Sequence, residues 1–226
     1  MREFRRRFSL PCRLQQRFHK ALFCFMKGSW QIANNRLHKD SGQKAALTCE
    51  PERSTANNKM KVKNTHERTV SSPIQPVGEL LNSLSAPRDR LWPSESWPPM
   101  RFDRPLGEGA KGGHGPIRYQ VTQFEPGRRV RFEFTGPPGF DGFHEFQLIS
   151  RSPEETIIRH AIRMKANGQA LFTWPVIFRP LHDSLIEDAF NKAERQLGLS
   201  AGKSDWSGWV RILRFLLKKR TRRTSA

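Results

Sequence analysis

The sequence has no run of the roughly 20 apolar residues that a membrane-spanning helix needs, which predicts a protein that is soluble or at most peripheral to a membrane. Cysteine is also scarce. The chain has only Cys12, Cys24 and Cys49, and none of them stands at a C-x-x-C or Cys/His spacing. Neither a disulfide framework nor a zinc site is indicated, and we expect no metal and no cofactor.

Acidic residues are few outside the middle of the chain. Residues 1–59 carry 13 basic against 4 acidic side chains and residues 201–226 carry 8 against 1, whereas residues 60–200 carry 19 against 16. The two ends therefore hold 16 of the 19 net positive charges. Nucleic-acid binding is expected of a folded surface that is itself basic. The near-neutral middle gives little support for a nucleic-acid partner.

The N-terminal segment, residues 1–59, is basic and polar, a composition typical of a disordered extension. An alternative interpretation is that the natural protein starts at Met60. The run Arg5–Arg7 looks like the start of an export signal, but further basic residues interrupt the apolar stretch that should follow. We therefore expect a cytoplasmic protein.

From Met60 onward the pattern predicts a folded domain that ends near residue 198. Residues 60–70 read as a polar strand, and residues 73–84 as a short helix. Between Ile117 and Lys165, apolar and polar residues alternate in four segments, each ended by a proline or glycine turn. Such segments indicate an antiparallel meander with one solvent-exposed face.

A long amphipathic helix is predicted at the end of this domain, from about residue 169 to residue 197. Pro175 and Pro180 should break or kink its first half, and Asp183 suits the positive end of the helix dipole. Its apolar stripe can be buried most simply against the apolar face of the sheet. We therefore expect an α+β fold in which a curved antiparallel sheet grips a long C-terminal helix.

Four stretches carry a resemblance to a known family: LWPSESWPPMRFDRPL, GGHGPIRYQVTQFEPGRRVRF, GFDGFHEF and FRPLHDSLIEDAF. With the order of elements, they make residues 60–223 similar to bacterial members of the SRPBCC (START-like, polyketide cyclase/dehydrase) superfamily. The resemblance implies a helix-grip fold with a cavity between helix and sheet. Lipid carriers, plant hormone receptors, aromatic cyclases and oxygenase domains all belong to that superfamily, so fold analogy does not select a function.

The turns set a strand register that sends two rows of side chains toward the helix. One row is Tyr119, Phe134, His144 and Ile162, and the other is Val121, Phe132, Phe146 and His160. His144 and His160 then become diagonal neighbours among aromatic rings. The candidate ligand contacts are His114, Tyr119, Phe132, Phe134, His144, Phe146, His160, Ile162, Trp174 and Phe178.

These residues allow three interpretations. An apolar chamber with a few polar groups is what a binding site for a small hydrophobic ligand needs. His144, His160 and Tyr119 could instead act as acid, base and oxyanion partner in an enzyme of the cyclase or dehydratase type. The third interpretation is structural, in which buried histidine and tyrosine only satisfy one another or a backbone carbonyl.

The glycine-rich segment before the meander matches G-x-G-x-x-G at Gly107, Gly109 and Gly112. It leads into a strand, so no helix N-terminus is present to hold a pyrophosphate, and we do not expect nucleotide binding there. His114 follows, either at the mouth of the cavity or exposed in a loop.

The C-terminal stretch, residues 199–226, is predicted to contain a linker and a basic amphipathic helix. Its apolar and basic sides suit a helix that lies on an anionic membrane surface, at the inner face of the membrane. The alternative is that the helix packs on its own domain. The candidate membrane contacts are Trp206, Trp209, Arg211, Arg214, Lys218 and Arg222.

Overall fold

The computed structural model describes residues 59–224, with side chains up to residue 217. The predicted disordered extension falls on residues 1–59 and therefore lies almost wholly outside the described residues. The seven strands are β1 (Met60–Val70), β2 (Arg101–Phe102), β3 (Lys111–His114), β4 (Ile117–Glu125), β5 (Arg129–Gly136), β6 (Phe140–Ser152) and β7 (Glu155–Ala166). The helices are α2 (Ile74–Asn82), α3 (Ala170–Thr173), the π-helix η2 (Trp174–Phe178), α4 (Arg179–Gln196) and α5 (Gly208–Thr224).

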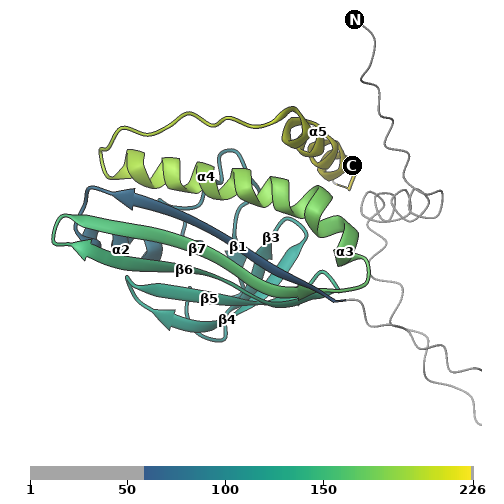
Figure 1. Ribbon diagram of the computed structural model, residues 1–226, viewed down its shortest axis with the longest axis horizontal. Helices are drawn as coiled ribbons and strands as arrows, with labels where there is room; N and C mark the ends of the chain where they lie inside the picture. Colours follow the sequence, from purple (N-terminus) through teal and green to yellow (C-terminus); the bar gives the residue numbers. More distant parts are fainter. Residues whose placement is uncertain (1–58, 225–226) are drawn as a thin grey trace, which may run out of the picture. The chain divides into compact units, whose positions relative to one another are not determined.

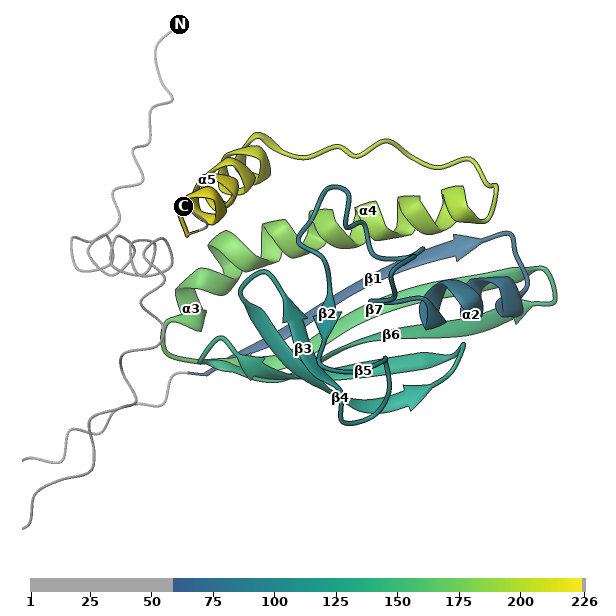
Figure 2. The same ribbon diagram turned by 180° about the vertical axis from the view of Figure 1, so that it is seen from behind.

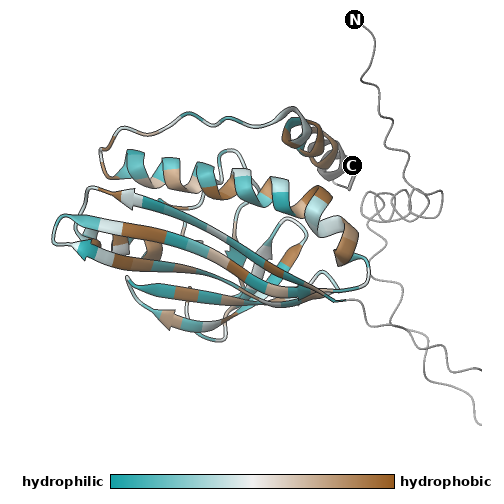
Figure 3. Cartoon of the chain, in the orientation of Figure 1, coloured by the Kyte–Doolittle hydropathy of each residue, from teal (hydrophilic) through white to brown (hydrophobic). Residues whose placement is uncertain are grey.

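All seven strands form one antiparallel sheet in the order β1-β7-β6-β5-β4-β3-β2. Figures 1 and 2 show the sheet curving beneath α4, with β1 running alongside the helix. Hydropathy alternates along the long strands (Figure 3), as expected when one face is buried and the other is solvated. The predicted α+β helix-grip architecture is confirmed.

Polar side chains join the edge strand β1 to α4. Alternate residues of a strand lie about 6.7 Å apart, and residues four apart on a helix lie about 6 Å apart along its axis, so the two spacings nearly match. Side chains from β1 therefore meet carboxylates on α4 at successive steps. The residues from β1 are Asn64, His66 and Arg68, and their partners are Asp183, Glu187 and Glu194.

The strand register matches most of the predicted rows. His144 pairs with Ile162 across β6 and β7, and Tyr119 pairs with Phe134 across β4 and β5, as expected. Between β5 and β6 the register differs by two residues, so that His144 lies opposite Phe132 instead of Phe134. Side chains alternate between faces with a period of two, so this even shift leaves every side chain on the predicted face.

The glycine-rich segment contains a strand, β3, that the sequence did not predict. Gly112 and Gly113 lie within it, and a Cβ at either position would collide with a carbonyl oxygen, that of Arg101 or that of Ile117. The glycines therefore permit close pairing of β3 with β2 on one side and β4 on the other. This hairpin carries His114 to the interior.

The two prolines alter the long C-terminal helix without stopping it. Pro175 lies in the π-helical turn η2, and Pro180 is the second residue of α4, which continues from η2 through the helical residue Phe178. Asp183 does not cap the helix: α4 has no side-chain cap, and Asp183 pairs with β1 instead.

The chain after α4 runs back along that helix to reach α5 (Figures 1 and 2). This path buries Asp188 of α4. Its carboxylate accepts hydrogen bonds from Trp97, Trp206 and Ser204. Within residues 59–224, no helix has the length and apolar character needed to cross a membrane.

Candidate functional site

Five of the seven histidines lie in the described part of the chain, and all five gather between α4 and the sheet. They are His66, His114, His144, His160 and His182, from five different elements. Ring contacts connect four of them: His160 lies 4.9 Å from His182 and 5.5 Å from His144 between ring centroids, and His182 lies 5.8 Å from His66. His114 is linked to His144 through Tyr119, whose ring contacts both. We call these five residues the histidine cluster.

The inner part of the cluster is the pair His144 and His160. Their side chains meet at 3.3 Å between His144 Nδ1 and His160 Nε2. Their other ring nitrogens, His144 Nε2 and His160 Nδ1, are buried and have no hydrogen-bond partner among the described residues. Burial lowers the pKa of both imidazoles well below the usual value, so both are neutral at pH 7.

Aromatic rings surround this pair. Phe132 and Phe134 stack on His144 at 4.8 and 5.0 Å between ring centroids, and Phe146 meets His160 edge-on at 4.5 Å. Tyr119 also meets His144 edge-on, at 4.8 Å. The predicted inward rows are therefore brought together as an aromatic wall around two neutral imidazoles.

His114 joins the same interior from the glycine-rich hairpin. Its Nδ1 lies 3.1 Å from the hydroxyl oxygen of Tyr119, and its ring lies 4.7 Å from Trp92. Burial lowers the pKa of His114 to about 3 and raises the pKa of Tyr119, so both groups are uncharged at pH 7. His114 is half-buried at the end of β3 and not exposed in a loop, and its place at the mouth of a cavity stays a prediction.

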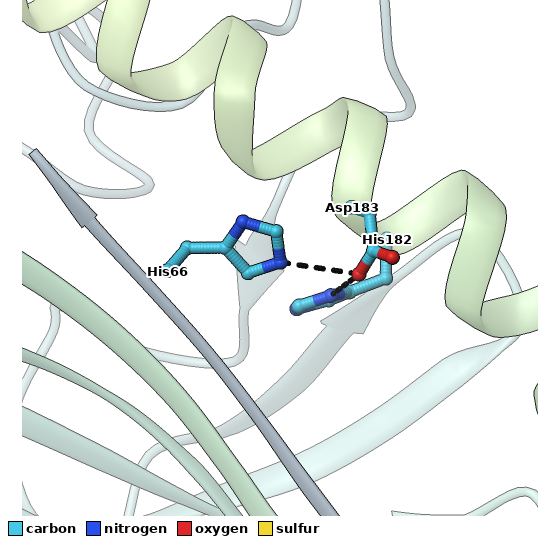
Figure 4. Close-up of side chains that lie close together, drawn as sticks. All are labelled: His66, His182 and Asp183. Atoms are coloured by element: carbon cyan, nitrogen blue, oxygen red, sulfur yellow. Dashed lines mark hydrogen bonds and ion pairs between the residues drawn. The ribbon is translucent and has the colours of Figure 1, made fainter. Parts of the chain in front are cut away.

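The outer part of the cluster joins β1 to the start of α4 (Figure 4). His66 Nε2 lies 3.1 Å from Asp183 Oδ1, and His66 Nδ1 lies 2.9 Å from Glu187 Oε1. His182 Nδ1 approaches the same Asp183 oxygen at 3.5 Å, and Asn64 Nδ2 donates to it at 2.9 Å. Three polar groups therefore converge on one carboxylate oxygen.

The charges of this outer part follow from its contacts. Burial alone would lower the pKa of His66, but hydrogen bonds to Asp183 and Glu187 outweigh it and leave that pKa raised. Burial would raise the pKa of Asp183, but hydrogen bonds from His182, His66 and Asn64 hold that pKa well below its usual range. Both ring nitrogens of His66 face carboxylate oxygens, an arrangement that favours the protonated imidazolium.

The remaining ligand candidates are also buried. Ile162 lies in the core, while Trp174 and Phe178 of η2 pack on Phe140 at 5.9 and 5.0 Å between ring centroids. Trp174 also approaches His182, at 6.2 Å. These contacts close the end of the interior that lies beneath η2.

The candidate membrane contacts, on α5 and just before it, divide into two groups. Trp206 and Arg214 turn inward: Arg214 is buried, with its guanidinium 3.7 Å from the ring of Trp206 and 4.2 Å from that of Trp97. Trp209 and Arg211 are exposed. The side chains of Lys218 and Arg222 lie outside the described residues.

Sequence reasoning missed His66, His182 and Glu187 as members of a site. The signal was present in the polar alternation of the first strand, because a strand that buries so few apolar residues must pair its inward polar side chains with something. What the sequence could not supply was the position of the helix relative to that strand.

Comparison with known proteins gives fold neighbours only. No family model matches the chain. No curated protein matches it either. Among solved structures, one from Thermobifida fusca is 19% identical and covers 62% of this chain and 97% of its own, with a TM-score of 0.47. Norcoclaurine synthase from Thalictrum flavum, in complex with dopamine and hydroxybenzaldehyde, is 11% identical, covers 71% and 100%, and has a TM-score of 0.48. CalU16 from Micromonospora echinospora is 13% identical, covers 75% and 96%, and has a TM-score of 0.43.

Proposed function

We propose that this domain binds a small hydrophobic molecule, lipid-like or aromatic, between α4 and the sheet, and that His144 and His160 orient it. The observation that carries the proposal is the pair of partnerless nitrogens, His144 Nε2 and His160 Nδ1. Leaving a buried polar atom without a partner costs about 1–3 kcal/mol. A ligand with one or two hydrogen-bonding groups recovers that free energy, while its apolar body contacts the aromatic wall.

The rings of the interior already touch one another, so binding requires side chains to move apart. The π-helical turn η2 is the place where we expect this movement. Such turns are rare and are found frequently at functional sites, and Trp174 and Phe178 of η2 close this end of the interior. A shift of η2 would remove Trp174 and Phe178 from Phe140, and Trp174 from the ring of His182, and so expose both rings.

The test is native mass spectrometry of the full chain purified from its own cells, followed by organic extraction of whatever is bound. A defined hydrophobic molecule at near-stoichiometric amount supports the proposal. The variant His144→Phe/His160→Phe keeps ring volume but removes both orienting nitrogens, and should lose most of that molecule. The matched control Gln147→Leu changes a residue on the opposite face of β6, the strand of His144, and should retain the bound molecule. An empty wild-type protein, or equal occupancy in the double variant, contradicts the proposal.

A second candidate is acid–base catalysis on the bound molecule. The observation that favours it is the contact between Tyr119 and His114, because a buried, protonated tyrosine can donate a hydrogen bond to a developing oxyanion. His144, neutral and in ring contact with Tyr119, would act as the base. Once the ligand is identified, Tyr119→Phe should lose turnover and retain binding if the domain is an enzyme. Unchanged turnover in the variant contradicts this role of Tyr119, and no turnover in the wild type leaves a carrier.

A third candidate is attachment to an anionic membrane surface through α5. The observation behind it is an exposed apolar patch of Trp209, Ile212 and Phe215 beside the exposed Arg211. Replacing all three apolar residues with serine should abolish sedimentation with vesicles that contain phosphatidylserine. This is a cleaner test than deleting residues 204–226, since deletion also removes Arg214 and Trp206 from their contacts with Trp97. Equal sedimentation of the triple variant contradicts membrane attachment.

A further inference from the structure

We propose that His66, His182 and Asp183 form a binding site for a divalent transition-metal ion such as Zn²⁺. The sequence indicated no metal site, and this inference goes beyond ligand binding in the interior. Each of the three residues offers one ligand atom, and these atoms all lie within 4.8 Å of one another. Two imidazole nitrogens and one carboxylate oxygen are a ligand set typical of zinc and other first-row divalent ions.

Two of the three distances between the ligand atoms fit an ion without large movement, and the third, between the two imidazole nitrogens, is at most 4.8 Å. A tetrahedral ion with bonds of 2.0–2.1 Å to nitrogen and oxygen places neighbouring ligand atoms about 3.3 Å apart. Asp183 Oδ1 lies 3.1 Å from His66 Nε2 and 3.5 Å from His182 Nδ1, which brackets that separation. Figure 4 shows both imidazoles directed at the same carboxylate oxygen.

The second coordination shell is also in place. A metal-binding histidine almost always donates its other ring N–H to a carboxylate, a backbone carbonyl or a water, which fixes the tautomer and the ring. His66 does so: its Nδ1 lies 2.9 Å from Glu187 Oε1, and Glu187 is held in turn by Arg68 at 2.9 Å. An ion would replace the proton that His66 Nε2 now shares with Asp183, and both ring nitrogens would keep a partner.

Two partnerless atoms lie at the same site. Asn64 donates to Asp183 through its nitrogen, yet its Oδ1 is buried and has no partner among the described residues. His182 Nε2 is also buried without a partner among the described residues. The one polar contact described for that ring, between His182 Nδ1 and Asp183 Oδ1, is 3.5 Å long, at the outer limit of a hydrogen bond. A water bound to the ion would donate a hydrogen bond to Asn64 Oδ1, and the ion itself would give His182 Nδ1 a stronger partner than its 3.5 Å contact with Asp183.

The site keeps contact with solvent, as an exchangeable ion requires. The side chains of His66 and His182 are 16% and 14% exposed, and that of Asp183 is 35% exposed. Three protein ligands leave a fourth position open, which is the arrangement of catalytic zinc sites, whereas structural sites are closed by four protein ligands. The ring of His182 also touches His160, so the ion would lie one ring away from the inner pair.

The test is a titration of the EDTA-treated full chain with Zn²⁺ by calorimetry and with Co²⁺ by visible absorption. Residues 1–58 carry three cysteines and two histidines, so the same titrations are made in a variant with Cys12, Cys24 and Cys49 changed to serine. In that background we expect one equivalent of either ion to bind, with a Co²⁺ spectrum of low coordination number. Binding should be lost in Asp183→Asn and in His182→Gln.

The second-shell contact gives a sharper readout than loss of a ligand. Glu187→Gln keeps the shape of a half-exposed side chain and leaves all three ligands intact, so the fold should survive. Loss of a second-shell partner commonly weakens metal affinity about 10–100-fold, and we expect a weakening of that size. The control Glu67→Gln lies on the opposite face of β1, paired with Arg159, and should bind like the wild type. No binding in the cysteine-free chain, or equal binding in Asp183→Asn, would overturn the proposal.

Discussion

His144 and His160 lie on neighbouring strands, diagonal to one another, and their ring nitrogens approach to 3.3 Å inside an aromatic wall. A neutral imidazole pair of this kind can share only one proton across the contact, because one nitrogen must donate and the other accept. The other nitrogens of the two rings, His144 Nε2 and His160 Nδ1, have no hydrogen-bond partner among the described residues. This polarity in the middle of an apolar core has consequences for stability as well as for binding.

Acid should destabilise the protein below about pH 6.5. Burial lowers the pKa of His114 to about 3 and lowers the pKa of His144 well below its usual value. Tyr119, Arg118 and His182 are the neighbouring titratable groups. The unfolded chain binds protons at these histidines near pH 6.5 while the folded chain does not. The contribution of these two histidines to stability is therefore complete above pH 6.5 and is lost progressively as the pH falls from 6.5 toward 3.

The measurement is urea unfolding between pH 5 and pH 8. Each neutral buried histidine contributes up to about 1.4 kcal/mol per pH unit to the slope of the free energy of unfolding against pH. His144→Phe replaces an imidazole that stacks on Phe132 with a ring that never takes up a proton. Its slope below pH 6.5 should be shallower than that of the wild type. Parallel slopes would show that His144 is protonated in the folded state.

The ion pair between Arg68 and Glu194 should contribute more to stability than the pair between Arg159 and Glu67, the residue next to Arg68 on β1. Arg68 Nη1 lies 2.8 Å from both oxygens of Glu194, whose side chain is only 12% exposed. Removing one partner of a buried pair leaves an uncompensated charge and costs about 3–5 kcal/mol. Because this pair is only partly buried, we expect about 2 kcal/mol for Arg68→Met.

The control for that prediction is Arg159→Met. Arg159 pairs with Glu67 at 2.6 Å, but both side chains are well exposed on the other face of the sheet. Exposed ion pairs contribute about 0–1 kcal/mol. Chemical denaturation of the two variants should separate them by at least about 1 kcal/mol, and equal losses would mean that burial does not decide the strength of these pairs.

Two glycines of the G-x-G-x-x-G stretch should respond very differently to alanine. A Cβ at Gly112 would collide with the carbonyl oxygen of Arg101, where β3 pairs with β2. Gly112→Ala must push these strands apart, and we expect it to destabilise the fold by about 1–3 kcal/mol. A Cβ at Gly107 would meet its nearest atom at 3.9 Å, so Gly107→Ala should be neutral. Thermal unfolding of both variants measures the difference, and equal Tm values would contradict it.

The sequence was sufficient to predict the long helix and five of the seven strands, but only the inner part of the histidine cluster. Alternation along the meander placed His144 and His160 on the inner face, and a register error of two residues between β5 and β6 did no harm, since it preserved that face. His66 could not be assigned in the same way. Its role depends on where α4 crosses β1, which is set by packing of the whole sheet.

The C-terminal helix illustrates the same limit. Its periodicity was clear from the sequence, yet one arginine on its predicted basic side is buried in the structure. Arg214 is buried between Trp97 and Trp206 and donates to the carbonyl oxygen of Ser96. Arg211, three positions earlier, stays exposed. Periodicity alone could not distinguish the two residues, because the tryptophans that select Arg214 come from distant parts of the chain.

Arg214 should therefore hold α5 on the domain, and a lysine should not replace it. Lysine keeps the charge but loses the planar guanidinium that stacks on two indole rings. A cation–π contact contributes about 0.5–2 kcal/mol according to how far it is desolvated, and Arg214 makes two of them at 3.7 and 4.2 Å. We expect Arg214→Lys to free α5 without unfolding the sheet, because α5 contacts no strand of it closely.

Two measurements check this expectation. Tryptophan fluorescence should shift to longer wavelength as Trp97 and Trp206 gain contact with water, and limited proteolysis should cut the segment between α4 and α5 faster than in the wild type. Arg211→Lys is the matched control on the exposed side of the same helix: it loses the hydrogen bond from Arg211 Nε to the backbone oxygen of Trp206 but no ring contact, and should behave like the wild type in both assays. If the two lysine variants are indistinguishable, α5 is held by the apolar contacts of Val210 and Leu213 alone, which are buried whichever cation stands beside them.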